Sequence, residues 1–363
     1  MRLKMQTGNE KQQKERRIGM KQGETLRLCS RSEDVTRAGE ILRGGGLVGI
    51  PTETVYGLAA NALDAQAVGR IFAAKGRPQD NPLIVHVARW EDMLPLVTAV
   101  PEAAKALARD YWPGPLTMIL PRSGRVPAVV SAGLDTVAIR MPSHPAARAV
   151  ILPAGVPLAA PSANRSGSPS PTTAQHVLDD LDGRIEAVLD GGVCSVGLES
   201  TVVDLTHDVA RLLRPGAVTV DMLRRTLGAI EVDDAVTHRL RDGAVAASPG
   251  MKYKHYAPKA QVTLVCGTPE AFAAFVNERA AREPEVTAMC FDGEETALQV
   301  PFVTYGRRDN AADQAQRLFD TLRALDERGA KRVYAACPSE DGVGLAVYNR
   351  LLRAAGFEVI HLD

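Results

Sequence analysis

The chain is 363 residues long, which as a prior suggests two domains, and its 45% hydrophobic and 24% charged residues are typical of a soluble protein. Lysine plus arginine and aspartate plus glutamate both number 43, so the charge balance does not indicate a long nucleic-acid-binding track, although it allows a local basic patch. No apolar stretch approaches the roughly 18 residues that a membrane-spanning helix needs.

The first 24 residues are polar and basic and lack the apolar segment of a secretory signal. We expect residues 1–24 to be a disordered basic extension, with Met20 as an alternative initiator and a targeting role as the weaker alternative. The cysteines form no Cys-x-x-Cys pair, which argues against a structural zinc or a thioredoxin-like site; they are Cys29, Cys194, Cys266, Cys290 and Cys337. Scattered single thiols are typical of the reducing cytoplasm, where we expect them to be small buried apolar side chains.

Regular patterning begins near Thr25 and predicts alternating strands and helices up to residue 228. Helices are expected at 33–42, 65–75, 102–110, 145–152 and 218–227, with another running from a Thr172 cap to Gly183. Asp64 is a suitable N-cap for the helix at 65–75, and Gly76 a suitable stop. Strands are expected at 47–50, 83–87, 116–120, 136–140, 156–160, 185–189, 200–205 and 210–213.

The pattern weakens from 228 to about 248, which we interpret as a linker of about 20 residues, long for a structureless loop in a compact domain, leading into the sequence PGMKYKHYAP at 249–258. Strands and helices then alternate at 262–266, 269–281, 287–291, 310–328, 332–336, 343–355 and 357–361, which predicts a small βαβ unit with a parallel sheet. The expected domains are therefore 25–228 and 260–363, joined by a linker at 229–259.

Polar side chains gather where predicted strands end, the usual place for ligand sites in α/β proteins. Lys75 and Arg77, close to Asn81, suit a polyanion such as a triphosphate; the alternative is a solvated basic helix end favoured by the helix dipole. The segment 161–167 can form an anion-binding nest or be an ordinary loop. The segments 197–201 and 214–216 are weak signals individually, because serine and threonine at strand starts are usually structural.

Several common site types are missing from the sequence. It contains no Gly-x-Ser-x-Gly elbow, no GxxxxGK[ST] phosphate loop and no GxGxxG dinucleotide loop. The histidines most relevant to a metal show no zinc-binding spacing such as HExxH; they are His86, His144, His176 and His255. Any nucleotide must therefore be held by something other than the common glycine-rich loops.

In their order along the chain, these segments resemble the threonylcarbamoyl-AMP synthase family in its two-domain form. The motifs that carry the resemblance are PTETVYG at 51–57, KGRP at 75–78 with NPL at 81–83, WPGPLT at 112–117, GLDT at 133–136 continuing to Arg140, PSAN at 161–164, EST at 199–201, RPG at 214–216 and the 249–258 segment. Together they are highly specific and span the chain from about Thr25 to its C-terminus, while the basic extension lies outside the family pattern.

The resemblance implies an α/β fold, an open twisted sheet with a large basic concavity, followed by a small Rossmann-like C-terminal α/β domain. It implies a nucleotidyltransferase that condenses L-threonine, bicarbonate and ATP to threonylcarbamoyl-AMP and pyrophosphate, with Mg²⁺ held mainly by the ATP phosphates. The product would be passed to proteins that complete tRNA threonylcarbamoyladenosine.

The resemblance also implies roles for individual residues. Lys75 and Arg77 would be catalytic. The ATP-binding set would comprise Lys75, Arg77, Asn81, Thr136, Ser162, Asn164, Ser170, Arg214, Tyr253 and His255. Threonine would be held by Thr52 or Thr54, His86, Arg140 and Ser200, with Arg140 as the carboxylate clamp. We expect Lys75 and Arg77 to face solvent in the empty pocket, and the 249–258 segment to be a lid, or else a passive tether.

Two other functions were considered. A carbamoyl-adenylating domain of the hydrogenase-maturation type shares this core, but such enzymes carry an acylphosphatase-like region and zinc-finger cysteines that are missing here. A double-stranded RNA-binding or ribosome-assembly module of the same fold is the alternative from a different class. Neutral net charge and only 4% aromatic residues argue against it.

Overall fold

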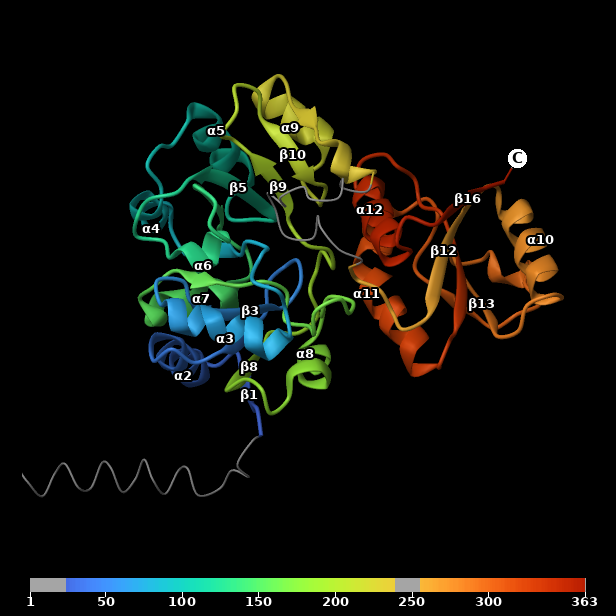
Figure 1. The fold of residues 1–363 in the computed structure, drawn as a ribbon, viewed down its shortest axis with the longest axis horizontal. Helices are drawn as coiled ribbons and strands as arrows, with labels where there is room; N and C mark the ends of the chain where they lie inside the picture. The colour runs from blue at the N-terminus through green and yellow to red at the C-terminus, as the bar shows by residue number, and fades with distance from the viewer. Residues whose placement is uncertain (1–23, 239–254, 363) are drawn as a thin grey trace, which may run out of the picture.

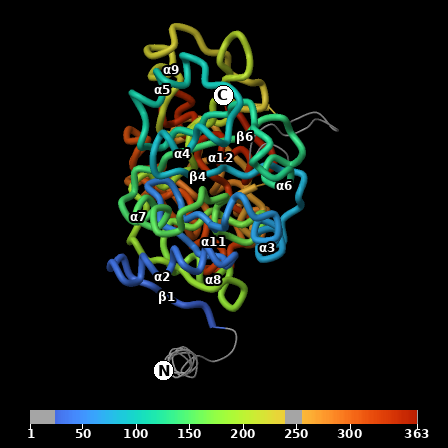
Figure 2. The backbone as a smooth tube through the Cα atoms, turned by 90° about the vertical axis from the view of Figure 1, so that its left-hand side faces the viewer, coloured from blue at the N-terminus to red at the C-terminus, as the bar shows by residue number. Residues whose placement is uncertain are grey.

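A computed structural model describes residues 24–238 and 255–362 of the protein. These residues form two lobes side by side (Figure 1). Helices α11 (Ala311–Glu327) and α12 (Gly344–Ala354) of the second lobe face the first lobe, and the view from the first lobe's side places the second lobe behind it (Figures 1 and 2). The predicted extension at residues 1–23 lies outside the described residues, as do Tyr253 and most of the predicted lid.

An eleven-stranded mixed sheet forms the framework of the first lobe, in the order β1-β8-β2-β3-β7-β4-β6-β5-β9-β10-β11. Its strands are β1 (Leu26–Cys29), β2 (Val48–Ile50), β3 (Gly57–Asn61), β4 (Ile84–His86), β5 (Leu116–Pro121), β6 (Thr136–Arg140), β7 (Leu158–Ala159), β8 (Ala187–Asp190), β9 (Thr201–Asp204), β10 (Arg211–Arg214) and β11 (Glu231–Val232). Parallel pairs such as β4/β6 and β5/β9 are mixed with antiparallel pairs such as β5/β6 and β9/β10. The predicted open α/β sheet is confirmed.

The helices of the first lobe end where the sequence provides caps and breakers. They are α2 (Ser32–Arg43), α3 (Ala65–Lys75), α4 (Trp90–Met93), α5 (Glu102–Tyr111), α6 (Ala128–Ser131), α7 (Pro145–Ala154), α8 (Ala174–Leu181) and α9 (Val220–Leu227), with short 3-10 turns at Leu94–Leu96 and Asp234–Val236. The Asp64 side chain accepts from the amides of Gln66 and Ala67, and Gly76 ends α3 with φ of 64°, as predicted.

The second lobe is a five-stranded parallel sheet in the order β14-β13-β15-β12-β16, as the βαβ pattern predicted. Its elements are β12 (Gln261–Cys266), α10 (Pro269–Ala280), β13 (Val286–Cys290), the 3-10 turn Glu295–Ala297, β14 (Phe302–Thr304), α11, β15 (Arg332–Ala336), α12 and β16 (Val359–His361). Its buried core extends into the first lobe, because Val55 and Leu198 belong to the same apolar cluster as Phe319 and Leu351.

One local prediction is wrong, and several short elements were not predicted. Thr173, not Thr172, caps α8, because the Thr173 hydroxyl accepts from the amide of His176. The predicted linker contains a short strand, since Glu231–Val232 pairs in parallel with β10. The other strands and α-helices that were not predicted are only three to five residues long, namely β1, β3, β14, α4 and α6.

The cysteine prediction also needs correction. Cys266 and Cys337 form a disulfide, because they follow the paired residues Val265 and Ala336 at the ends of the adjacent strands β12 and β15. Cys29 is exposed, whereas Cys194 and Cys290 are free and buried as expected. The cysteines therefore no longer support a reducing compartment. Among the described helices, none combines the length and apolar character that crossing a membrane requires.

Candidate active site

A cavity of about 50 Å³ lies in the first lobe where several strands end, and His255 and Tyr256, at the described end of the linker, complete its lining. Nine side chains that the sequence assigned to the site line it: Thr52, Thr54, Arg77, His86, Arg140, Ser162, Ser200, Arg214 and His255. They come from the turn after β2, the end of α3, the ends of β4, β6 and β10, the loop after β7, the residue before β9 and, for His255, the linker before β12. The fold thus brings together residues that are up to 203 positions apart.

One wall of the cavity is built around Arg140, the last residue of β6. Its guanidinium donates to the Thr54 hydroxyl at 2.8 Å and to the carbonyl of Gly114 at 3.3 Å. Its third nitrogen forms an ion pair with Glu53 at 2.8 Å, and both side chains are buried. Burial alone would raise the pKa of Glu53, but Arg140 lowers it below its ordinary value, so Glu53 is ionised and locks the guanidinium in place.

Glu53 was not among the residues assigned to the site from the sequence, although its ion pair with Arg140 places it at the candidate site. Its position between two threonines in PTETVYG was the available signal. The Thr52 hydroxyl is also fixed locally, since it lies 2.8 Å from the Thr54 hydroxyl and donates to the carbonyl of Val55 at 2.6 Å.

Arg77 presents an incompletely satisfied cation to the cavity. Only 9% of the residue is exposed, and its Nε and one Nη have no hydrogen-bond partner among the described residues. Burial lowers the pKa of Arg77 to about 10, which leaves it charged at neutral pH. A buried guanidinium with free donors is costly unless an anion fills the site, so the geometry favours a phosphate or carboxylate ligand there.

Lys75 is also buried, at 3% exposure, so the prediction that Lys75 and Arg77 face solvent is wrong. For Lys75 the physical reason is the loop after β7, which covers its side chain. Lys75 Nζ donates to the carbonyls of Ser162 and Asn164 and lies 3.3 Å from Asn164 Oδ1. Burial, aided by Arg77, holds the pKa of Lys75 well below its usual range. Lys75 therefore anchors the loop in addition to adding charge.

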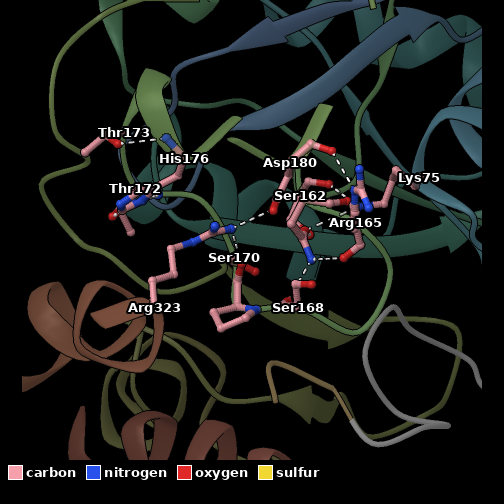
Figure 3. Close-up of polar contacts among 12 residues, drawn as sticks. Lys75, Ser162, Arg165, Ser168, Ser170, Thr172, Thr173, His176, Asp180 and Arg323 are labelled. Atoms are coloured by element: carbon pink, nitrogen blue, oxygen red, sulfur yellow. Dashed lines mark hydrogen bonds and ion pairs between the residues drawn. The ribbon is translucent and has the colours of Figure 1, made fainter. Parts of the chain in front are cut away.

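The loop that Lys75 anchors is a compact hydrogen-bonded turn (Figure 3). The Ser162 hydroxyl donates to Asn164 Oδ1 at 2.6 Å, and Asn164 Nδ2 donates to the carbonyls of Arg165 and Ser168 at 2.7 and 2.8 Å. From the second lobe, Arg323 of α11 donates to the carbonyl of Pro169 and forms an ion pair of 2.7 Å with Asp180 (Figure 3). Both lobes therefore hold this loop.

The opposite wall joins the ends of β9 and β10. Arg214 donates to the carbonyl of Ser200 at 3.0 Å and to its hydroxyl at 3.2 Å, and that hydroxyl lies 2.7 Å from the Thr117 hydroxyl. Gly216 permits this approach, because a Cβ there would lie 2.5 Å from the amide nitrogen of Thr201. Glu199, which sequence reasoning quoted only as part of a motif, also lines the cavity.

Two buried histidines contribute polar atoms without charge. Burial, with Arg140 nearby, lowers the pKa of His86 to about 3, and burial with Arg77 lowers the pKa of His255 to about 3. His86 Nδ1 lies 3.3 Å from the carbonyl of Ile84, while His255 Nδ1 has no partner in the described part of the chain. Both rings are neutral at physiological pH and can donate or accept one hydrogen bond each.

Two family models match the chain. One, the Sua5/YciO/YrdC model described as telomere recombination, covers residues 40–216, and one described as the threonylcarbamoyl-AMP synthase C-terminal domain covers residues 218–356. The threonylcarbamoyl-AMP synthase of Pyrococcus abyssi is 46% identical over 326 residues, which are 89% of this chain and 94% of that relative. The Bacillus subtilis enzyme is 43% identical over 338 residues, covering 93% and 97%.

The chain belongs to the threonylcarbamoyl-AMP synthase family. Two solved structures agree with this assignment. A double-alanine variant of P. abyssi Sua5 superposes with a TM-score of 0.88 at 42% identity, covering 93% of this chain and 98% of that one. P. abyssi Sua5 in complex with L-threonine gives a TM-score of 0.86, also at 42% identity, covering 93% and 99%. The two-domain form that the sequence indicated is therefore confirmed.

Five other residues that the resemblance assigned to the site do not line the cavity. Lys75 and Asn164 lie in the loop network, and the Ser170 hydroxyl donates to Glu199. Asn81 is buried with its Oδ1 unpartnered among the described residues. Thr136 is at the start of β6, four residues before Arg140 and thus about 13 Å along the strand.

Proposed function

We propose that this protein is an L-threonylcarbamoyladenylate synthase that uses ATP, L-threonine and bicarbonate, with pyrophosphate as the second product. The observation that carries the proposal is the pair of buried guanidinium groups in one cavity. Arg140 is a fork fixed by Glu53, and Arg77 has donors without partners among the described residues. Such a pair suits a substrate carboxylate and a phosphate chain held close together.

In this proposal, Arg140, Thr54, His86 and Ser200 form the threonine side of the cavity. The Arg140 fork binds the carboxylate, and the neutral His86 and the hydroxyls provide the remaining polar contacts. Arg77, Asn81, Arg214 and His255 form the nucleotide side, supported by the loop of Ser162 and Asn164 that Lys75 anchors. Ser170 and Thr136 are assigned to nucleotide binding by the family resemblance alone.

The reaction needs positioning and charge neutralisation more than covalent help. The threonine amine and bicarbonate form a carbamate with loss of water. A carbamate oxygen then attacks the α-phosphorus, the bond from that phosphorus to the bridging oxygen breaks, and pyrophosphate leaves. Arg77 and Arg214 offset the negative charge that grows on the leaving group, while Arg140 holds the nucleophile.

We propose that Mg²⁺ arrives with ATP and is held by phosphate oxygens and water. The residues present fit that arrangement, because the cavity's carboxylate, Glu199, is already paired with Arg350. Within residues 24–238 and 255–362, no group of three or more His, Cys, Asp or Glu side chains could hold a metal ion. The ion would neutralise phosphate charge as the bond to pyrophosphate breaks.

The proposal extends to the product's use. A carbamoyl-adenylate is labile, so a second protein must accept it, and the family resemblance points to tRNA threonylcarbamoyl-transfer proteins in the cytoplasm. We also propose that serine is a poorer substrate by roughly 10- to 200-fold, because a pocket sized for one extra methyl discriminates by only about 1–3 kcal/mol.

The deciding experiment measures pyrophosphate release by the purified full-length chain. Release must require ATP, threonine and bicarbonate together, and mass spectrometry must detect the threonylcarbamoyl-adenylate. The RNA-binding alternative predicts that RNA is retained without pyrophosphate release. Arg109→Met is the control for Arg77→Met, because Arg109 is an exposed arginine that pairs, within the described part of the chain, with its neighbour Asp110. Release without threonine would contradict the proposal.

A further inference from the structure

Arg350 of α12 reaches from the second lobe into the back of the candidate active site. The residue is fully buried, and all three of its guanidinium nitrogens are engaged with the first lobe. Its Nε donates to a carboxylate oxygen of Glu199 at 2.8 Å, one Nη donates to the Glu199 carbonyl at 3.2 Å, and the other donates to the carbonyl of Pro215 at 3.0 Å. One planar group therefore joins two segments of the site.

These two segments carry residues assigned to the substrates. Glu199 is followed directly by Ser200, and Pro215 is preceded directly by Arg214, whose guanidinium donates to Ser200. Glu199 also accepts from the hydroxyl of Ser170. A shift of Glu199 or Pro215 would thus move a threonine-side hydroxyl and a nucleotide-side cation at once.

Arg350 helps to keep the buried carboxylate of Glu199 ionised. Burial alone would raise the pKa of Glu199, but Arg350 and then Arg214 lower it, so the carboxylate is ionised. Replacing a buried ion pair with apolar side chains of similar volume is often neutral or stabilising, so docking of the lobes alone does not require a charged contact. The planar guanidinium of arginine can hold three acceptors in fixed directions, which apolar packing cannot do.

The same guanidinium lies beside the described end of the linker. Its central carbon is 5.8 Å from the ring centroid of Tyr256, which packs against Phe319 of α11 at 5.3 Å. Tyr256 lies 4.8 Å from the ring of His255, a cavity-lining residue. The contacts of Arg350 therefore reach a third segment of the site.

We propose that Arg350 is a positioning residue of the synthase reaction, through which the second lobe aligns Ser200 and Arg214. It touches no substrate and acts through Glu199 and Pro215. The proposal rests on the proposed function, because alignment has meaning only for that reaction. It gives the second lobe a direct part in building the active site.

The test compares Arg350→Met, Arg350→Lys, Glu199→Gln and the double variant Arg350→Met/Glu199→Gln with the parental protein. Asp180→Asn is the control, because it weakens another ion pair between the lobes, the part-buried one with Arg323, and Asp180 contacts neither Glu199 nor Pro215 through a hydrogen bond or ion pair within the described residues. Steady-state kcat and KM for ATP and threonine are measured alongside thermal unfolding. The double variant keeps the test decisive if Arg350→Met does not fold, since it leaves no unpaired carboxylate.

We expect Arg350→Met to lower kcat/KM by about 100-fold, the scale of a small misplacement of reacting groups, and to raise KM for both substrates. Loss of folded protein would instead lower the apparent kcat and leave KM unchanged. The double variant should lose no more than Arg350→Met, and Arg350→Lys should lose less because its ammonium can still pair with Glu199. Asp180→Asn should stay within about threefold of the parental protein.

Parental kcat and KM in the folded double variant would overturn the proposal, and so would an equal loss in Asp180→Asn. A separate measurement distinguishes this failure from failure of the proposed function. If the parental protein releases no pyrophosphate, the proposed function is wrong. The alignment of Arg214 is then measured as the ATP-induced rise in unfolding temperature, which Arg350→Met must reduce and Asp180→Asn must not.

Discussion

Gly197 of the first lobe lies against the backbone of Gln316 in α11, so closely that a Cβ built on Gly197 would be 2.4 Å from the Gln316 Cα. It would also lie 2.6 Å from the carbonyl oxygen of Ala315. Backbone atoms of a helix cannot move aside as a side chain can. The close approach of the two lobes at this point therefore requires a residue without a side chain at position 197.

Gly197→Ala should push the two lobes apart at this contact and impair the candidate active site. We expect a loss of about 1–3 kcal/mol of stability from overpacking, and at least a tenfold loss of turnover. Gly192→Ala is the control, because Gly192 has a similar positive φ, 85° against 80°, but a Cβ there meets nothing within 4 Å. Equal unfolding temperatures and activities for the two variants would show that the close approach does not matter.

Arg77→Met and Lys75→Met should both abolish most pyrophosphate release but change stability in opposite directions. Arg77 has donors without partners among the described residues, so removing its buried charge should raise the unfolding temperature. Lys75 satisfies two buried carbonyls, so its removal should cost about 1–3 kcal/mol. Chemical unfolding of both variants with ATP absent is the measurement. A destabilised Arg77→Met would contradict the view of Arg77 as a strained ligand-binding cation.

Acid should destabilise the protein through its buried neutral histidines. The pKa of His86 is lowered to about 3, so between roughly pH 6.5 and pH 3 the unfolded chain takes up a proton that the folded protein does not. Stability contributed by this group is therefore complete above pH 6.5 and is lost as pH falls. His86→Gln should flatten the fall in unfolding temperature between pH 7 and pH 4. A parallel pH profile for the variant would rule out His86 as a source of acid sensitivity.

Arg140→Lys should weaken threonine binding selectively. The lysine ammonium can still pair with Glu53, but it cannot also donate to Thr54 and present a planar fork. We expect kcat/KM for threonine to fall by at least tenfold, with KM for ATP changed by less than threefold. Arg122→Lys is the control, because Arg122 is a part-buried arginine that donates to the carbonyls of Val126 and Leu134 in the loop before β6. A rise confined to KM for ATP would contradict this assignment and indicate that Arg140 binds the nucleotide instead of threonine.

The elements of this fold could be predicted wherever local chemistry decides them. Helix α3 begins after the Asp64 cap and ends at Gly76, because a carboxylate satisfies free amides and only glycine adopts that left-handed turn easily. The parallel sheet of the second lobe follows in the same way from its regular βα alternation. The motifs also assigned residues to the site, and nine of those residues line one cavity.

What the sequence by itself determined is therefore the family, most of the longer helices and strands, and nine of the side chains that line the cavity. Only the tertiary structure decided the environment of each group. Lys75 and Arg77 look like an exposed helix end in the sequence, yet both are buried, Lys75 beneath the loop after β7. Arg350 looks like an ordinary residue of a distant helix, yet it pairs with Glu199 across 151 positions. Burial and the contacts between lobes depend on which distant segments pack together, and local propensities carry no record of that packing.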